Sequence, residues 1–142
     1  MQAVDIFKSA LRTQGYKITK NRIAILEYLQ TTNKPLSAEE ILIHIQRDHQ
    51  NVVKTTIYRE LEFLIKIKFV SEVEFGDGKK RYELSLNKPH HHHVICRSCK
   101  RVEDIPLESD FESTQDDIEK LTNFKLTGHM LEFFGLCKTC QN

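Results

Sequence analysis

The four cysteines constrain the fold more than any other feature of this 142-residue chain. They form two C-x2-C pairs, Cys96 with Cys99 and Cys137 with Cys140. Two thiolates from each pair complete a tetrahedral all-sulfur shell of the kind that zinc prefers. A closed shell leaves no position for a substrate, so we expect a structural Zn²⁺. It would tie the C-terminal segment to the strand that leads into Cys96 and contribute folding free energy.

Two other uses of these cysteines, a redox motif and disulfide bonds, are less consistent with the chain. A redox C-x2-C motif normally lies where a strand meets a helix in a larger fold, and two matched pairs are not expected there. The first residues lack the basic segment, apolar stretch and cleavage site of a secretory signal, and no stretch resembles a membrane span. We therefore expect a cytoplasmic protein with no membrane partner, whose cysteines bind metal in a reducing compartment.

Four consecutive histidines, residues 90–93, stand just before the first cysteine pair. Side chains alternate between the two faces of a strand, so His90 and His92 would point one way and His91 and His93 the other. One short strand would thus supply two imidazoles to each of two metal sites. Mixed shells of histidine and carboxylate suit Fe²⁺, Zn²⁺, Mn²⁺ or Co²⁺. The candidates for the remaining ligands are Glu83, Asp104, Glu112 and His129.

The N-terminal half predicts four helices followed by a β-hairpin. Apolar periodicity and capping residues place the helices at residues 4–14, from a cap at Thr19 to about 29, from the capping box Ser37–Glu40, and at about 54–66. The period then changes from about 3.6 to about 2 residues. Strands are expected over residues 69–75 and 80–86, separated by the turn Gly76-Asp77-Gly78. This order predicts a winged helix-turn-helix whose fourth helix reads DNA.

The fourth helix has a polar face suited to that task. With Ile57, Leu61 and Leu64 in the core, an outward face is predicted to carry Thr55, Tyr58, Arg59 and Glu62. A threonine or tyrosine can contact a thymine methyl group, and an arginine can bind a phosphate or a guanine. The hairpin adds Lys79, Lys80 and Arg81, and the start of the second helix adds Lys17, Lys20 and Arg22. A solvated face of a small helical domain is the alternative interpretation.

Charge is distributed unevenly between the two halves. Residues 1–88 contain 15 Lys and Arg against 11 Asp and Glu, a net charge of +4, whereas residues 89–142 contain 6 against 9, a net charge of −3. All four cysteines and five of the seven histidines follow the break at Asn87-Lys88-Pro89. We expect an α+β protein with an N-terminal winged helix-turn-helix DNA-binding domain, residues 1–86, and a C-terminal α/β metal-binding domain, residues 87–142.

Taken together, these motifs resemble the ferric uptake regulator superfamily over nearly the full length of the chain. The segments that carry the resemblance are Tyr16–Arg22, Ser37–Glu40, Thr55–Arg59, Tyr82-Glu83, His90–Cys99, and Cys137 with Cys140. The resemblance implies a repressor, not an enzyme, that dimerises through its C-terminal domain. When loaded with metal, it would bind AT-rich inverted repeats in double-stranded DNA; assembly beyond the homodimer to a tetramer is left open.

The resemblance also implies a role for each motif. Tyr58 and Arg59 match contacts of the recognition helix, and Lys17 matches a basic residue that reaches the minor groove. The four cysteines match the structural zinc site. A site near the dimer interface would use His90, His92, Glu112 and His129, although the family often has Asp where this chain has His92. A regulatory site that bridges the two domains would use Glu83, His91, His93 and Asp104.

One departure bears on the metal that is sensed. The family's regulatory site usually takes another histidine from the loop before the third helix, where this chain has Lys34-Pro35. This absence and the unbroken histidine run favour zinc, whereas Glu83 and the lack of a cysteine outside the two pairs favour iron. A peroxide sensor tends to use Asp in place of Glu83. We prefer Fe²⁺ as the regulatory ion, with Zn²⁺ and Mn²⁺ as alternatives.

An enzyme and a metal-storage protein are the two alternative classes. A metallo-hydrolase or redox enzyme would need an activated nucleophile or general base beside an open metal position, and none is evident. A metal buffer or storage protein would need no reading helix. The preferred hypothesis is a regulator in which metal favours the arrangement that binds DNA, by its differential affinity for two states.

Overall fold

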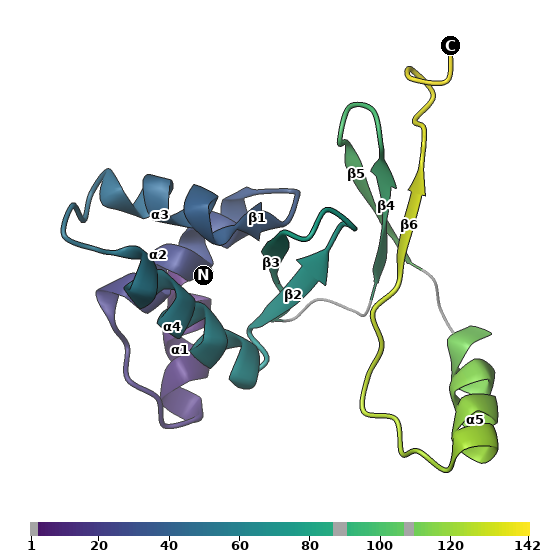
Figure 1. Ribbon diagram of the computed structural model, residues 1–142. Coiled ribbons are helices and arrows are strands. Elements are labelled where there is room, and N and C mark those ends of the chain that lie inside the picture. Colours follow the sequence, from purple (N-terminus) through teal and green to yellow (C-terminus); the bar gives the residue numbers. More distant parts are fainter. Residues whose placement is uncertain (1–2, 87–90, 107–109) are drawn as a thin grey trace. The chain divides into compact units, whose positions relative to one another are not determined.

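The computed structural model describes residues 3–86, 91–106 and 110–142, apart from the side chains of 110–112, in two compact units, Met1–Lys88 and Pro89–Asn142 (Figure 1). The first unit contains α1 (Ala3–Thr13), α2 (Lys20–Thr31), β1 (Leu36–Ser37), α3 (Ala38–Gln46), α4 (Lys54–Lys66), β2 (Val70–Glu74) and β3 (Lys80–Leu84). The second contains β4 (His92–Cys96), β5 (Val102–Ile105), α5 (Asp110–Thr122) and β6 (Glu132–Gly135). No helix in the described ranges is long and apolar enough to cross a membrane.

Local signals set the boundaries of the N-terminal helices. The side-chain oxygen of Thr19 accepts a hydrogen bond from the backbone N–H of Arg22, which caps α2 at the predicted residue. Ser37 and Glu40 form both hydrogen bonds of the predicted capping box at α3. After α1, Gly15 has a φ of 78°, a left-handed conformation that glycine adopts without steric cost. The four predicted helices are therefore confirmed, with ends shifted by one or two residues.

The core of the N-terminal unit is built on α4. Ile57, Leu61 and Leu64 are all buried on one face of this helix, as predicted. Ile41 from α3 and Leu26 from α2 belong to the same buried cluster. Full burial of an aliphatic side chain of this size contributes about 1.5–3 kcal/mol relative to its exposed state. The buried face fixes which side chains of α4 remain available to solvent.

The hairpin is part of a three-stranded antiparallel sheet in the order β1-β3-β2. Both hairpin strands are shorter than predicted, and the turn between them contains Gly76 and Gly78 with φ of 79° and 74°. The two-residue strand β1 was not predicted: Leu36 pairs with Tyr82 and Ser37 with Arg81. This pairing anchors the hairpin beside the start of α3, which completes the winged helix.

The C-terminal unit contains a second three-stranded sheet, in the order β5-β4-β6. Its central strand β4 pairs antiparallel with β5 and parallel with β6. Parallel neighbours need a long crossover connection, which here includes β5 and α5. In this arrangement His93 is paired with Asp104 of β5 and with Glu132 of β6, whereas His92 is paired with Ile105 of β5.

Candidate metal centres and nucleic-acid interface

The four cysteines lie together, with all four sulfur atoms within 4.8 Å of one another. All four are free thiols, and the Sγ atoms of Cys99 and Cys137 are 3.8 Å apart. Zinc–sulfur bonds of about 2.3 Å in a tetrahedron place sulfur atoms about 3.8 Å apart, whereas a disulfide would need about 2 Å. The sulfur positions therefore fit a four-coordinate metal ion.

Charge within this cluster also favours a cation. The backbone N–H of Cys137 donates to Cys96 Sγ at 3.4 Å, and this bond, with further amide hydrogen bonds, lowers the pKa of Cys96 to about 6. Cys140 behaves in the opposite way. A hydrogen bond from the Ser98 side chain favours its thiolate, but the nearby sulfurs of Cys137 and Cys96 raise the pKa of Cys140 to about 11. One thiolate forms readily and its neighbours oppose further negative charge, which a bound metal ion would offset.

The predicted alternation of the histidine run is confirmed where the structure describes it. His92 and His93 are consecutive residues of β4 and both are buried, so their side chains lie on opposite faces of the sheet. His91, immediately before β4, has its ring 5.0 Å from that of His93, measured between centroids. His90 lies outside the described residues. The run therefore divides between two faces, with His91 and His93 together on one of them.

On that face, His91 and His93 meet the carboxylate of Asp104. The Nε2 atoms of His93 and His91 lie 3.5 Å and 4.0 Å from Asp104 Oδ1. Their ligand atoms all fall within 4.8 Å of one another. A tetrahedral ion with bonds of about 2.1 Å separates its nitrogen and oxygen ligands by about 3.4 Å. These three residues fit a metal ion, and an imidazole–carboxylate set suits Fe²⁺, Zn²⁺ or Mn²⁺.

A carboxylate that the sequence did not single out contacts the same ring. Glu132 Oε2 on β6 lies 3.0 Å from His93 Nδ1. The alternation of Leu131, Glu132 and Phe133 was the available signal, because a charged residue between two apolar ones in a strand points to the opposite face. The partner of Glu132 could not have been predicted without the pairing of β4 with β6.

The opposite face holds two of the four residues expected at the second histidine site. The rings of His92 and His129 have centroids 5.3 Å apart. His92 Nδ1 lies 3.2 Å from the carbonyl oxygen of Leu131. Because a carbonyl only accepts, Nδ1 donates its proton and Nε2 retains the lone pair that binds metal. The side chain of Glu112 lies outside the described residues, as does His90, so the full set stays a prediction.

His129 also has a partner that the sequence did not indicate. The side-chain nitrogen of Gln115, on α5, lies 2.7 Å from His129 Nδ1. An amide nitrogen only donates, so Nδ1 accepts and the proton of the neutral ring is on Nε2. Metal binding by either nitrogen of His129 then requires this hydrogen bond to break or the amide to turn over.

Glu83, the remaining predicted ligand, is a half-buried residue of β3 in the N-terminal unit. Its backbone pairs with Ser71 of β2. Its role as a ligand stays a prediction.

The α4 face opposite the core presents the predicted reading residues. Thr55 and Arg59 are exposed, and Tyr58 is half-buried against the core cluster. The Tyr58 hydroxyl lies 3.5 Å from Glu39 Oε1, which also pairs with Lys54 Nζ at 3.2 Å. A hydrogen bond from its own backbone and then the one from Lys54 lower the pKa of Glu39. Glu39 thus holds two side chains near the start of α4.

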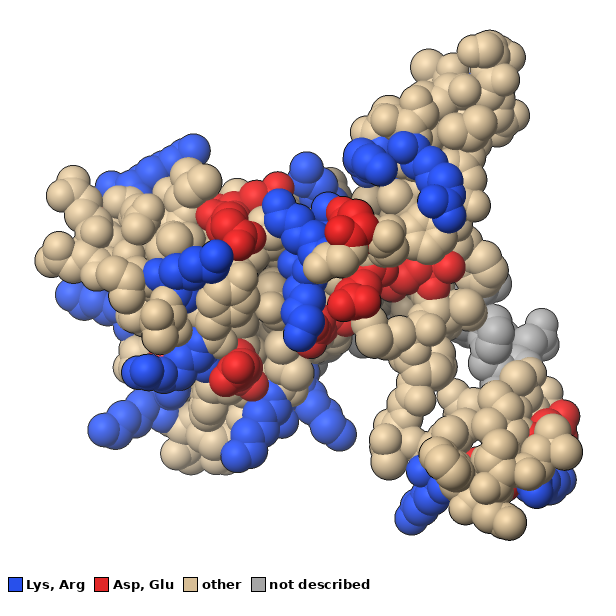
Figure 2. Space-filling model, in the orientation of Figure 1, with Lys and Arg blue, Asp and Glu red and all other residues tan. Residues whose placement is uncertain are grey.

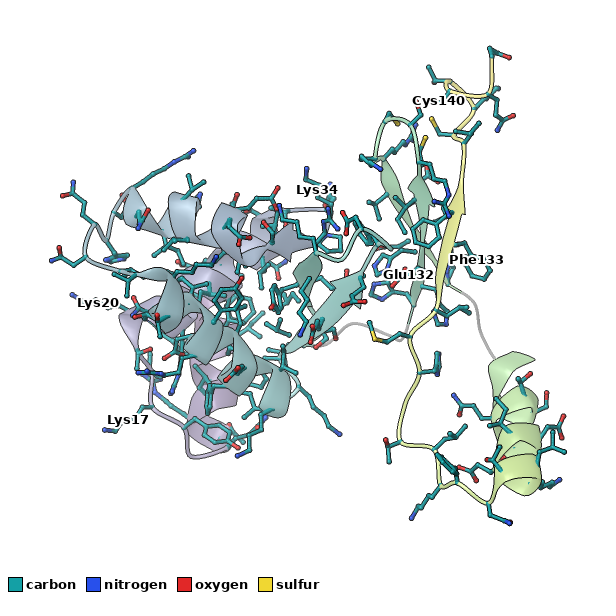
Figure 3. The ribbon with its side chains drawn as sticks, viewed as in Figure 1. Lys17, Lys20, Lys34, Glu132, Phe133 and Cys140 are labelled. Carbon is teal, nitrogen blue, oxygen red and sulfur yellow. The ribbon has the colours of Figure 1, made fainter. Side chains whose placement is uncertain are left out.

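Lys17 and Arg22 differ in the contacts that their side chains make within the N-terminal unit. Lys17 is exposed and extends into solvent (Figure 3). Arg22 Nε donates to Glu60 Oε2 at 2.9 Å, and its guanidinium also donates to the Lys17 carbonyl at 2.8 Å. The same guanidinium lies 3.9 Å from the centroid of the Phe63 ring. Arg22 is therefore a structural residue, and contact with DNA stays a prediction for it and for Lys17.

The basic residues of the hairpin are partly neutralised by their neighbours. Arg81 forms a two-point contact with Asp77, and Lys80 pairs with Glu72 at 3.1 Å. Figure 2 shows Lys and Arg side chains over much of the visible face of this unit, interspersed with acidic ones. On this face the basic side chains therefore lie among acidic ones that partly offset their charge.

Comparison with known proteins decides the family. The family model described as "Ferric uptake regulator family" matches residues 13–134. This chain belongs to the ferric uptake regulator family. Among members of the family, it is 37% identical to the ferric uptake regulation protein of Campylobacter jejuni subsp. jejuni over 142 residues, which cover 98% of this chain and 88% of that protein.

Members with a different named response are similarly close. The peroxide-responsive repressor PerR of Staphylococcus saprophyticus is 35% identical over 139 residues, covering 94% of this chain and 88% of the repressor. The solved structure of the Helicobacter pylori ferric uptake regulator Fur, described as revealing three functional metal binding sites, has a TM-score of 0.72 and 30% identity. That match covers 98% of this chain and 91% of the Helicobacter chain. The ferric uptake regulator fold, a winged helix followed by a C-terminal α/β unit, is therefore shown.

At the departure noted in the sequence, this ferric uptake regulator family member has Pro35 buried and Lys34 exposed. Pro35 precedes β1, whose residue Leu36 pairs with Tyr82. Proline offers no metal ligand, and its position just before the strand is compatible with its fixed φ. The loop thus contributes packing at the place where the resemblance implies a histidine ligand.

Proposed function

We propose that this protein is a metal-dependent, DNA-binding transcriptional repressor that controls metal homeostasis. The observation that carries the proposal is the meeting of His91, His93 and Asp104 in a chain whose other unit is a winged helix. The two imidazoles and the carboxylate would together coordinate one divalent ion. A metal-storage protein would need the histidine–aspartate cluster but would not need a winged helix.

The proposed metal ions have different roles. Cys96, Cys99, Cys137 and Cys140 would hold a structural Zn²⁺, in a shell with no open position. His91, His93 and Asp104, with Glu83 as the resemblance implies, would hold the regulatory ion. His92 and His129, with His90 and Glu112, would form the third site.

Iron is the proposed regulatory ion. Glu83 rather than a thiol in the implied ligand set favours the harder Fe²⁺ over Zn²⁺. The name of the Campylobacter relative points the same way, as that of a ferric uptake regulator. Zinc uptake control and peroxide sensing are the alternatives within the family, and the similarity to PerR of Staphylococcus keeps the second one open.

The proposed target is an AT-rich inverted repeat, bound by a homodimer. Thr55, Tyr58 and Arg59 would contact bases or phosphates from α4, and Lys17 and Arg22 would add contacts nearby. The C-terminal unit leaves six large apolar side chains exposed among its described residues, which a second copy would cover: Ile118, Leu121, Phe124, Met130, Phe133 and Leu136. A tetramer is a further state to be tested.

Fluorescence anisotropy of a labelled AT-rich inverted-repeat duplex tests the proposal. Protein that retains zinc but lacks exchangeable metal is titrated at fixed salt, then reloaded anaerobically with Fe²⁺, Mn²⁺ or Zn²⁺. We expect tight binding only after reloading, with Fe²⁺ most effective. A variant with Tyr58→Ala and Arg59→Ala should take up the same metal and fail to bind DNA. Equal binding by stripped and loaded protein would contradict the proposed switch, and metal uptake without any DNA binding would favour storage.

A further inference from the structure

We propose that Glu132 is a positioning residue for the regulatory metal. Its carboxylate fixes the proton of His93 on Nδ1, so that Nε2 of the same ring presents its lone pair to the ion. The inference rests on the proposed function, because it takes His91, His93 and Asp104 as a metal site. Glu132 lies outside the predicted ligand set and acts on one ligand, His93, by orienting its ring.

The contact between Glu132 and His93 assigns the two ring nitrogens. Glu132 Oε2 lies 3.0 Å from Nδ1, and an ionised carboxylate only accepts hydrogen bonds. Nδ1 therefore carries the proton in this contact. On the other side of the ring, Nε2 lies 3.5 Å from Asp104 Oδ1. In the neutral ring, two electron-rich atoms then face each other, which is the arrangement that a cation between them would stabilise.

The register of the sheet explains why these residues meet. His93 is paired with Asp104 in the antiparallel β4–β5 ladder and with Glu132 in the parallel β4–β6 ladder. Side chains at paired positions lie on the same face, so the three form a row across the sheet with the histidine at its centre. Figure 3 shows Glu132 and its neighbour Phe133 leaving β6 on different sides. The backbone thus fixes both carboxylates relative to one ring.

Burial makes the contact stronger than a surface ion pair. The side chains of His93 and Glu132 are 3% and 14% exposed, whereas that of Asp104 is 55% exposed. A hydrogen bond to a charged group gains strength when it is sheltered from water. The exposed Asp104 is accessible to an incoming ion, and the sheltered Glu132 is placed to orient the ring behind it. This division of roles is typical of metal-bound histidines, whose second nitrogen donates to a carboxylate.

The test compares Glu132→Ala, Glu132→Gln and a matched control, Glu103→Ala. Glu103 is an exposed residue of β5 that pairs with Arg101, and it gives the same change in net charge. Full-length protein with one equivalent of zinc for the cysteines is titrated with Co²⁺ in competition with a chelator. We expect Glu132→Ala to weaken Co²⁺ binding at this site by about 10- to 100-fold with unchanged stoichiometry. Glu132→Gln should lose less, because its amide oxygen still accepts the hydrogen bond, and Glu103→Ala should match the wild type.

A second readout reports the ring directly, before any Co²⁺ is added. At a pH where the His93 ring is neutral, its side-chain ¹⁵N chemical shifts should show the proton on Nδ1 in the wild type and a mixture of tautomers in Glu132→Ala. Unchanged tautomers, or Co²⁺ affinity equal to that of Glu103→Ala, would overturn the inference alone. A changed Co²⁺ absorption spectrum at saturation would also overturn it, since Glu132 would then be a ligand. Failure of the wild type to bind Co²⁺ at this site would instead overturn the proposed function, and the inference with it.

Discussion

Arg22 on α2 is joined to Glu60 on α4 by a hydrogen-bonded ion pair of 2.9 Å, with both side chains only 17% exposed. The guanidinium is also stacked on the Phe63 ring and bonded to the Lys17 carbonyl. One side chain therefore connects α2 to α4, the predicted reading helix, and it is a residue that the sequence placed among the candidate DNA contacts.

Replacing Arg22 by alanine should destabilise the N-terminal unit. Loss of the charge-assisted hydrogen bond and the stacking should lower the free energy of unfolding by about 2 kcal/mol. Lys17→Ala, which removes an exposed charge nearby, should change it by less than about 0.5 kcal/mol. Urea denaturation followed by circular dichroism measures both values. Equal stabilities of the two variants would show that the pair contributes nothing.

Opposite charges on the exposed face of α4 should affect DNA binding in opposite directions. Arg59→Gln should weaken binding and lower the slope of log affinity against log salt by about 1 if Arg59 contacts a phosphate. Glu62→Gln removes a negative charge from the same exposed face, so it should strengthen binding. Anisotropy titrations at several salt concentrations give both slopes. An effect of the same sign in both variants would mean that this face does not lie on DNA.

Removal of the proposed structural Zn²⁺ should unfold the C-terminal unit while leaving the N-terminal one folded. The buried cluster built on α4 draws all its members from residues 3–86 and does not depend on the cysteines. Cys99→Ser removes one of the four proposed sulfur ligands, so the variant should contain one equivalent less of tightly bound zinc. Limited proteolysis should leave a resistant N-terminal fragment and degrade residues 91–142. Full resistance of both units in a zinc-free variant would contradict a structural role for the metal.

Alkaline pH should destabilise the fold in part through Tyr82. Burial, and then the charge of Glu72, raise the pKa of Tyr82 to about 12 from its ordinary value of 10. The phenol is protonated in both states below about pH 10, so its contribution to stability is fully present there. As the pH rises from about 10 towards 12, the unfolded chain loses its proton first and stability falls. Tyr82→Phe has no ionisable hydroxyl group, so its stability lacks this dependence on pH.

The free energy of unfolding of wild type and Tyr82→Phe should therefore diverge in slope above pH 10, with the wild type falling more steeply. Urea denaturation at closely spaced pH values measures the difference, and the other tyrosines and lysines cancel in the comparison. Parallel curves for the two proteins would show that Tyr82 titrates normally in the folded state.

Local signals predicted the N-terminal half well, and long-range pairing was what they missed. The capping box of Ser37 and Glu40 and the apolar face of α4 are encoded within a few residues, so periodicity and caps were sufficient. β1 has two residues and exists only because Leu36 meets Tyr82 far along the chain. A strand of that length carries no periodicity of its own.

The candidate metal sites show the same division. The spacing of the cysteines predicted that they would cluster. The alternation of side chains along a strand predicted that His92 and His93 would lie on opposite faces of the sheet. Glu132 was missed because its partner is set by the parallel register of two strands separated by a helix, which no local pattern encodes. Arg22 was assigned from its charge alone, whereas its contacts with Glu60 and Phe63 depend on how α2 packs on α4.

The parallel pairing of β4 with β6 has a consequence for synthesis on the ribosome. β6 is made only after β5 and α5, so a nascent chain that stops before residue 132 already displays His91, His93 and Asp104 without Glu132. That chain has also made one cysteine pair and not the other. At this stage His91, His93 and Asp104 are all present, but the His93 ring lacks the carboxylate that contacts its Nδ1. The orientation of the His93 ring by Glu132 is therefore acquired late in synthesis, when β6 pairs with β4.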